Sequence, residues 1–312
     1  MKDGQPVALV TGANGFIGGH VSRALMREGW IVRRAVRRSC GTGDEVVVGP
    51  LGPATNWQTV LIDVDAVVHL AARVHHKNDE QAVEAYRIAN VEGTLHLARS
   101  AIDAGVARFV FLSTVLVHGR SNDGRGPFSE SDVLTPRGLY AASKAGAEAG
   151  LSALANNDMQ ITVIRPPLVY GSGAKGNFAL LVKVVKRGIP LPFAAINNHR
   201  AFVSVDNLTS FILRRLSVPG GSFDTFLVAD QEQVSTPEFV TRLANAAKVK
   251  PRLFPFPMVA LGALLRAAGK HDTHDSLVGS LQLTCSKAAS IGWTPPVSLD
   301  EGLDRALNTV AL

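Results

Sequence analysis

The chain has 312 residues, of which 46% are hydrophobic; this supplies a core for one large domain or two intimately joined ones and excludes a disordered or fibrous protein. A formal net charge of +6 arises from 32 Lys and Arg scattered among 26 Asp and Glu, with no basic run that alternates with aromatic residues. We therefore expect no nucleic-acid partner.

The two cysteines, Cys40 and Cys285, are far apart and lack CxxC spacing, which argues against a disulfide framework or structural zinc and fits a reducing compartment. The chain enters a strand-like run at Val7 without the apolar region and cleavage site of a secretory signal. Residues 258–265 form the most apolar later stretch, well short of the roughly 20 residues of a membrane span. We expect a cytoplasmic protein with no membrane partner, and a buried or interfacial helix at 258–265.

In the first half, short apolar runs alternate with amphipathic helical patterns over residues 16–28 and 84–105, which Gly29 and Gly105 close at their C-terminal ends. This alternation is typical of a parallel sheet covered by helices on both faces. We predict a Rossmann-type doubly wound parallel α/β sheet. Its strands are expected near residues 7–10, 31–32, 46–48, 66–70, 108–113 and 161–165.

After about Tyr170, loops rich in Gly, Pro and Asn separate shorter helices and isolated strands. STPE at 235–238 and SLDE at 298–301 predict helix starts of the capping-box kind. We predict a dinucleotide-binding domain over residues 1–170 and a mainly substrate-binding subdomain over 171–312, with FDTFLVAD (223–230) returning to the sheet.

The stretch VALVTGANGFIGGHVSRAL sets a strand, then Gly12, Gly15 and Gly18, then a helix. Glycines at this spacing allow a tight turn with close backbone approach, and the free N–H groups of the helix start can receive a pyrophosphate. Because strand, glycines and helix occur in the order that a dinucleotide site requires, we predict that this turn binds such a cofactor.

TGANGFIG also resembles the TGxxGxxG motif of the extended short-chain dehydrogenase/reductase family, and five further segments resemble motifs of that family. These segments are DAVVHLAA (65–72), NVEGT (90–94), FLSTVLVHG (111–119), YAASK (140–144) and IRPPLVYG (164–171). The resemblance implies NAD(P)(H) as cofactor and a homodimer. The contacts it implies with the cofactor come from Gly12, Asn14, Gly15, Phe16, Ile17, Gly18, Leu70, Ala71, Ala72, Asn90, Tyr140, Lys144 and Pro167, with Asn90 also structural.

Tyr140 and Lys144 are four residues apart, which places them on one face of a helix. A free tyrosine has a pKa of about 10, and a nearby ammonium lowers it, so that Lys144 would make Tyr140 useful as a general acid and base. The family alignment assigns the third catalytic position to Thr114, which would orient the reacting oxygen, and leaves Ser113 as its neighbour.

Val115 and Leu116 follow Thr114, where the 4,6-dehydratases of this family carry an Asp-Glu pair, so we expect no dehydration. Asn177 and Arg200 resemble the residues with which nucleotide-sugar enzymes of the family hold the substrate diphosphate, a task that suits a guanidinium. Ser204 replaces the histidine of that arginine motif.

Leu191 and Phe193 of the PLPF loop are predicted either to line a uracil pocket or to belong to the core. His75-His76 and the pair His271 and His274 are interpreted as polar loop residues, and no metal is expected.

Four arginines occur in WIVRRAVRRSC (30–40). In dinucleotide folds the second strand ends at the adenosine ribose, where NAD enzymes place an acid on the 2′-OH. That position falls on Val36, which Arg37 and Arg38 follow, so we expect no carboxylate there to repel a 2′-phosphate and two guanidiniums to bind it. Arg33 and Arg34 are interpreted as structural or solvated. This predicts a preference for NADP(H).

The resemblance narrows to a subgroup similar to UDP-glucose 4-epimerase that includes UDP-4-keto-sugar reductases of bacterial polysaccharide synthesis. We predict an oxidoreductase acting at C4 of a UDP-hexose or UDP-N-acetylhexosamine derivative, by 4-keto reduction or 4-epimerisation, with reduction slightly favoured by the NADP(H) preference. The alternatives are a reductase of a non-nucleotide carbonyl, as in the dihydroflavonol-reductase and hydroxysteroid branches, and a non-catalytic cofactor sensor.

Overall fold

The computed structural model describes residues 4–41, 43–74, 80–156, 158–257, 260 and 277–308. The chain divides into two compact units that interleave along the sequence. The first unit comprises Met1–Val117, Val133–Pro166 and Thr209–Phe226, and the second comprises His118–Asp132, Pro167–Leu208 and Leu227–Leu312. The domain boundary at residue 170 stays a prediction.

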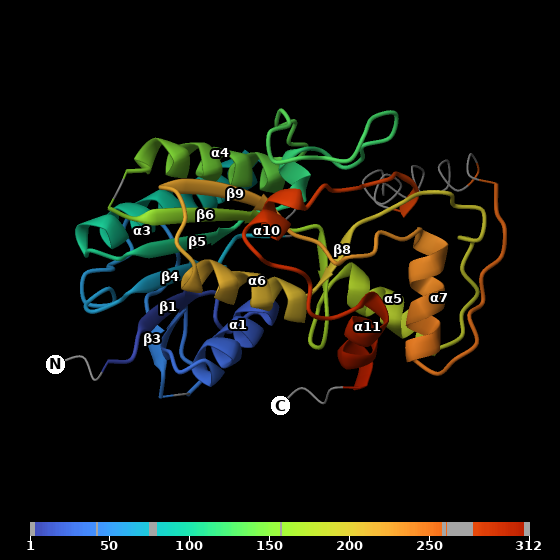
Figure 1. Ribbon diagram of the computed structural model, residues 1–312, viewed down its shortest axis with the longest axis horizontal. Helices are drawn as coiled ribbons and strands as arrows, with labels where there is room; N and C mark the ends of the chain where they lie inside the picture. Colours follow the sequence, from blue (N-terminus) through green and yellow to red (C-terminus); the bar gives the residue numbers. More distant parts are fainter. Residues whose placement is uncertain are drawn as a thin grey trace. The chain divides into compact units, whose positions relative to one another are not determined.

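A seven-stranded sheet in the order β3-β2-β1-β4-β5-β6-β9 is the framework of the first unit (Figure 1). The pairings β1–β2, β1–β4, β2–β3, β4–β5 and β5–β6 are all parallel. The strand order reverses beside β1, which is where doubly wound sheets bind their ligands. This confirms the predicted Rossmann-type fold. The strands are β1 Val7–Thr11, β2 Ile31–Val36, β3 Glu45–Val47, β4 Ala66–His69, β5 Arg108–Leu112, β6 Gln160–Arg165 and β9 Phe223–Leu227.

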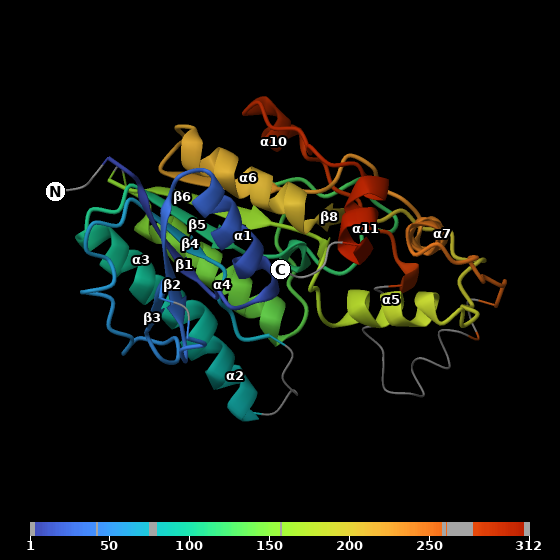
Figure 2. The same cartoon turned by 90° about the horizontal axis from the view of Figure 1, so that it is seen from below.

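Helices cover both faces of this sheet, α3 and α4 on one face and α1 and α6 on the other (Figures 1 and 2). The central strands β1 and β4 are therefore buried along their whole length, which explains their nearly unbroken apolar sequence. The helical segments of this part are α1 Phe16–Arg27, α2 Glu80–Tyr86, the π-helical η1 Arg87–Glu92, α3 Gly93–Asp103, the 3₁₀ turn η2 Val115–Val117, α4 Leu139–Leu154 and α6 Val205–Ser217.

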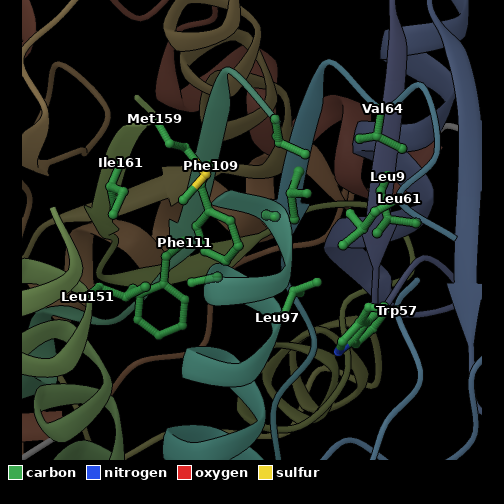
Figure 3. Packing of buried hydrophobic residues seen from close by; sticks show 14 of the residues in the cluster. Leu9, Trp57, Leu61, Val64, Leu97, Phe109, Phe111, Leu151, Met159 and Ile161 are labelled. Atoms are coloured by element: carbon green, nitrogen blue, oxygen red, sulfur yellow. The ribbon is translucent and has the colours of Figure 1, made fainter. Parts of the chain in front are cut away.

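The main core lies between the sheet and the α3–α4 layer (Figure 3). Phe109 and Phe111 of β5 stand at its centre, with Leu97 of α3 and Leu151 of α4 packed beside them. Each such buried side chain contributes roughly 1.5–3 kcal/mol relative to an exposed one. The core thus fixes the strand ends from which the candidate site is built.

The helix ends follow the signals in the sequence. Gly29 and Gly105 adopt positive φ, +81° and +72°, directly after the ends of α1 and α3. Ser235 Oγ accepts from the backbone N of Glu238 at 3.2 Å, so the first predicted helix start is confirmed. The second is confirmed by the same contact between residues 298 and 301, at 3.3 Å.

The second unit contains a small parallel pair, β7 Leu168–Tyr170 and β8 Phe202–Ser204. Its helices are α5 Asn177–Lys186, α7 Thr236–Ala246, α10 Ser286–Ser290 and α11 Leu299–Asn308. An aromatic core of Tyr170, Phe178, Phe202 and Phe239 joins these elements. The prediction that FDTFLVAD returns to the sheet is confirmed, since β9 forms the edge of the seven-stranded sheet beside β6.

Some expectations fall on residues outside the described ranges. These are the helix at 258–265, of which only residue 260 is described, and the loops with His75, His76, His271 and His274. Among the residues that are described, no helix combines the length and apolar character needed to cross a membrane.

Candidate active site in the first unit

The glycine turn connects β1 to α1 and is closed by a hydrogen bond from Gly15 N to Gly12 O of 2.9 Å. Gly12 has φ +69°, and a Cβ there would lie 2.9 Å from the backbone N of Ala71. A Cβ on Gly18 would lie only 2.1 Å from Gly12 O. Glycine is thus required at Gly12 by conformation and by close packing, and at Gly18 by close packing.

The start of α1 suits an anion. Its first turn, FIGG, contains no acidic residue, and its N-cap is Gly15, whose residue type has no side chain to cap the helix. The first N–H groups of a helix lack intrahelical partners and carry partial positive charge. The turn therefore suits the pyrophosphate of a dinucleotide. The individual contacts of Gly12, Asn14, Gly15, Phe16, Ile17 and Gly18 stay predictions.

A buried histidine links this turn to α3. His69 Nε2 lies 2.9 Å from Thr94 Oγ1, which donates its own proton to Asn90 O at 2.7 Å, so the imidazole must donate to Thr94. His69 Nδ1 therefore accepts from Thr11 Oγ1 at 2.7 Å, and Thr11 Oγ1 accepts from Ala71 N at 3.2 Å. Burial, with the charge of Lys144, lowers the pKa of His69 to about 3, so the ring is neutral.

Asn90 lies in the π-helical segment η1 and is buried. Its side chain accepts from Arg73 N at 2.7 Å and donates to Arg73 O at 3.1 Å and to Ser143 Oγ at 2.9 Å. Ser143 Oγ in turn donates to Tyr140 O at 2.8 Å. The residue predicted as structural thus connects the segment after β4, which includes Leu70, Ala71 and Ala72, to the start of α4.

Tyr140 and Lys144 lie on the first turns of α4, and Lys144 is fully buried. Lys144 Nζ donates to Leu112 O at 2.7 Å and lies 4.4 Å from the centre of the Phe111 ring. Burial lowers the pKa of Lys144 to about 7, against the opposing effect of Glu148.

The pKa of Tyr140 is raised to about 12, because its phenol is desolvated and Tyr86 is nearby. This is the opposite of the expected lowering by Lys144, whose ammonium points to the end of β5 instead. The structure therefore presents Tyr140 as a protonated phenol, the form that can donate to a substrate oxygen.

Ser113 and Thr114 follow β5 and differ in their bonding. Ser113 Oγ donates to the buried carboxylate of Glu148. Thr114 Oγ1 accepts from Leu116 N at 3.2 Å, which caps the 3₁₀ turn η2, and a hydroxyl that accepts still has a proton to donate. This difference supports Thr114, not Ser113, at the third catalytic position.

A buried ion pair beneath this site escaped the sequence reasoning. Arg165 at the end of β6 donates to Glu148 Oε2 at 2.6 Å, and both side chains are less than a tenth exposed. Glu148 lies four residues after Lys144 and eight after Tyr140, so its helical spacing placed it on the same face. That spacing was the signal available in the sequence.

A carboxylate lies in the loop that follows β2. Arg37 and Arg38 are exposed there, and Glu45 of β3 reaches the same loop, with Oε2 accepting from Cys40 N at 2.7 Å and from Ser39 Oγ at 2.8 Å. Val36 ends β2 without an acid, as the sequence shows, but the sequence reasoning did not consider an acid from the neighbouring strand.

The two preceding arginines are structural, as interpreted. Arg33 donates to the backbone oxygens of Val60 and Ile62, and Arg34 pairs with Asp44 at 3.3 Å. They therefore leave Arg37 and Arg38 as the pair exposed at the end of β2.

The residues predicted to hold a substrate diphosphate lie in the second unit. Asn177 is the exposed first residue of α5. Arg200 is largely buried, donates to Gly279 O and has its pKa lowered to about 10 by desolvation, with Asp123 acting in the opposite direction.

Three further predicted contact residues are buried or partly buried in the same unit. Phe193 belongs to its apolar core and Leu191 packs against that core, which favours the core interpretation over a uracil pocket. Pro167 is buried next to β7. Their contacts with cofactor or substrate stay predictions.

A parallel sheet with a glycine turn at its switch point and a Tyr/Lys pair beside it defines a dinucleotide-dependent enzyme of the short-chain dehydrogenase/reductase type. The model of the NAD dependent epimerase/dehydratase family matches residues 8–228. The chain belongs to this family, as an enzyme of its extended type.

Relatives cover almost the whole chain. A UDP-glucose 4-epimerase of Vibrio cholerae is 38% identical over 94% of this chain and 92% of its own length. A ceramide reductase of Caulobacter vibrioides is 26% identical over 94% of this chain and 87% of its own. A solved structure of MoeE5 in complex with UDP-glucose and NAD is 26% identical, covers 96% of this chain and 97% of its own, and has a TM-score of 0.76.

Proposed function

We propose that this enzyme is an NAD(P)-dependent oxidoreductase acting at C4 of a UDP-hexose or UDP-N-acetylhexosamine derivative. One observation carries the proposal: α4 presents Tyr140 beside η2, which Thr114 caps, in a chain 38% identical to a UDP-glucose 4-epimerase. The nicotinamide ring, when bound, supplies hydride chemistry at the substrate carbon.

The side chains of the first unit handle the oxygen at that carbon. Tyr140 donates its phenolic proton to the C4 oxygen during reduction and takes it back during oxidation. Thr114 donates a hydrogen bond from its hydroxyl to the same oxygen and keeps its proton, so that it fixes the direction from which Tyr140 reaches that oxygen. Lys144 donates to Leu112 O at the end of β5, so its proposed part in the reaction is to hold the cofactor and not to lower the pKa of Tyr140.

Recognition of the diphosphate is assigned to the second unit. Arg200 has a planar donor fork that matches phosphate oxygens, and Asn177 stands at the positive end of α5. A substrate without a diphosphate would remove this binding role from both residues.

Of the two reactions that this site can perform, 4-epimerisation is now the first to test. The slight preference for reduction depended on NADP(H), and Glu45 weakens the argument for that cofactor. Reduction of a 4-keto sugar remains the second candidate, because Arg37 and Arg38 are still exposed at the end of β2.

Reduction of a carbonyl without a nucleotide is the alternative that the Caulobacter relative supports. This alternative differs from the proposed function only in the substrate that the enzyme accepts. If the enzyme reduces a long-chain keto lipid and leaves every UDP-sugar unchanged, the assignment of Asn177 and Arg200 is wrong.

The direct test incubates the enzyme with UDP-glucose and with UDP-N-acetylglucosamine and identifies the products by NMR, while absorbance follows NADH and NADPH. Epimerisation gives the C4 epimer without net change in the cofactor. Reduction requires a UDP-4-keto sugar and consumes one reduced cofactor for each product. A protein that binds cofactor yet converts none of these sugars would contradict the proposal.

A further inference from the structure

Several neighbouring groups hold the carboxylate of Glu45. Oε2 accepts from Cys40 N at 2.7 Å, from Ser39 Oγ at 2.8 Å and from Gly41 N at 3.2 Å. Oε1 accepts from Asn14 Nδ2 at 3.1 Å. Glu45 itself is only partly buried, so these donors surround an anion close to solvent.

Such an arrangement is an anion site built from the loop after β2. Two consecutive backbone N–H groups and a hydroxyl converge on one oxygen, which is the geometry of the backbone nests that bind phosphate. Here the anion they bind is the chain's own carboxylate, which β3 delivers because Ala35 pairs with Val46 and Val36 with Val47.

The position of this anion site relates it to the cofactor. Asn14 belongs to the glycine turn, and Ser39 follows Arg37 and Arg38 at the end of β2. In doubly wound folds that strand end adjoins the adenosine ribose, where the 2′-OH or the 2′-phosphate distinguishes NAD from NADP. The donors around Glu45 therefore lie where a 2′-phosphate would seek hydrogen bonds.

We infer that Glu45 determines the cofactor specificity of this enzyme, by occupying with its carboxylate the donors that a 2′-phosphate of NADP(H) needs. Binding of NADP(H) then requires that the carboxylate leave the loop or that two anions share it, whereas NAD(H) leaves it in place. Arg37 and Arg38 act in the opposite direction, because their charges attract the phosphate. This inference rests on the proposed function only in that the first unit binds a nicotinamide dinucleotide.

The test is a binding titration of NADH and NADPH, followed by calorimetry or protein fluorescence, with the wild type and Glu45→Gln. Glutamine keeps an oxygen acceptor but removes the charge that competes with the phosphate. We expect the Kd for NADPH to fall about fivefold relative to the Kd for NADH, the size of one charge interaction at a partly exposed site. Glu28→Gln is the matched control, since it removes the same charge at the far end of α1 and should change neither affinity.

Glu45→Ala is a second variant that removes the whole carboxylate. Either substitution could loosen the loop and weaken the binding of both cofactors, so the ratio of the two dissociation constants is compared, because a general loss of affinity cancels in it. Both variants are expected to shift the ratio toward NADPH. An unchanged ratio in two folded variants would overturn the role of Glu45 while leaving the proposed function intact. A wild type that binds neither dinucleotide would overturn both, and failure to convert UDP-sugars would affect the proposed function alone.

Discussion

Ser113 and Thr114 are neighbouring hydroxyls with separate tasks, and this difference can be measured. We expect Thr114→Val to lower kcat by about 10², because it deletes the hydroxyl donor toward the reacting oxygen, and Thr114→Ser to retain most activity. Ser113→Ala should instead cost about 1–2 kcal/mol of unfolding free energy, because buried Glu148 loses a donor. Steady-state kinetics and denaturant unfolding of the three variants check this assignment, which the reverse pattern would contradict.

The site residues that could be predicted from the sequence are placed by local spacing, whereas those that were missed are placed by contacts between distant parts of the chain. Tyr140 and Lys144 follow from spacing within one helix, and Gly12 and Gly18 from local turn chemistry. Glu45 enters through the pairing of β2 with β3, and sequence shows that two strands exist without showing which side chain crosses between them. The pKa of Tyr140 was mispredicted for a similar reason, since burial outweighs a charge that points elsewhere.

Where α1 packs against the glycine turn, two neighbouring glycines of the helix should differ sharply in their tolerance of alanine. Gly18→Ala would place a methyl group 2.1 Å from Gly12 O and 2.7 Å from Ala13 Cα, and backbone atoms cannot yield cheaply. We expect this variant to lose cofactor binding and to unfold at a lower temperature. Gly19→Ala, whose added Cβ would have as its nearest atom the end of the Arg23 side chain at 3.6 Å, should behave as the wild type in both measurements.

His69 joins β4 to β1 and α3, and its neutral state makes this junction sensitive to acid. The folded-state pKa of about 3 lies below the ordinary value of 6.5, so between these values the unfolded chain binds the extra proton. The neutral imidazole therefore contributes its full share of the free energy of unfolding above pH 6.5, and this contribution is lost as the pH falls toward 3. Between pH 6.5 and 4.5 we expect the wild type to lose about 2 kcal/mol more unfolding free energy than His69→Gln.

Equal acid sensitivity of the two proteins, measured by urea unfolding at several pH values, would show that the imidazole does not control this junction. The comparison with the variant is needed because other titrating groups affect both proteins alike.

The helical pattern over residues 84–105 predicts that the segment is helical but not which type of helix it forms. Helical elements cover this stretch as far as Asp103, but its middle, Arg87–Glu92, is a π-helical segment. This segment carries buried Asn90, whose side chain bonds to Arg73 and Ser143. A wider turn of this kind often accompanies a functional residue, and a 3.6-residue pattern does not reveal it.

For the whole molecule, the sheet and its order were predictable because alternating strands and helices allow few topologies. The return of the strand within residues 223–230 to the first unit was predictable as well, but the placement of His118–Asp132 in the second unit was not. Short segments of this kind acquire their partners only in the folded chain. The two-domain division at residue 170 therefore remains a proposal for the functional parts.

The central claim is that Tyr140 moves the proton at C4 of a UDP-sugar, and Tyr140→Phe tests it most directly. Its turnover of UDP-glucose and UDP-N-acetylglucosamine is measured by NMR. The control is Tyr86→Phe, which removes a neighbouring phenol that raises the pKa of Tyr140. We expect Tyr140→Phe to lose about 10²–10⁴ in kcat while it binds cofactor normally, and Tyr86→Phe to stay active. Turnover by Tyr140→Phe at the wild-type rate would contradict the account.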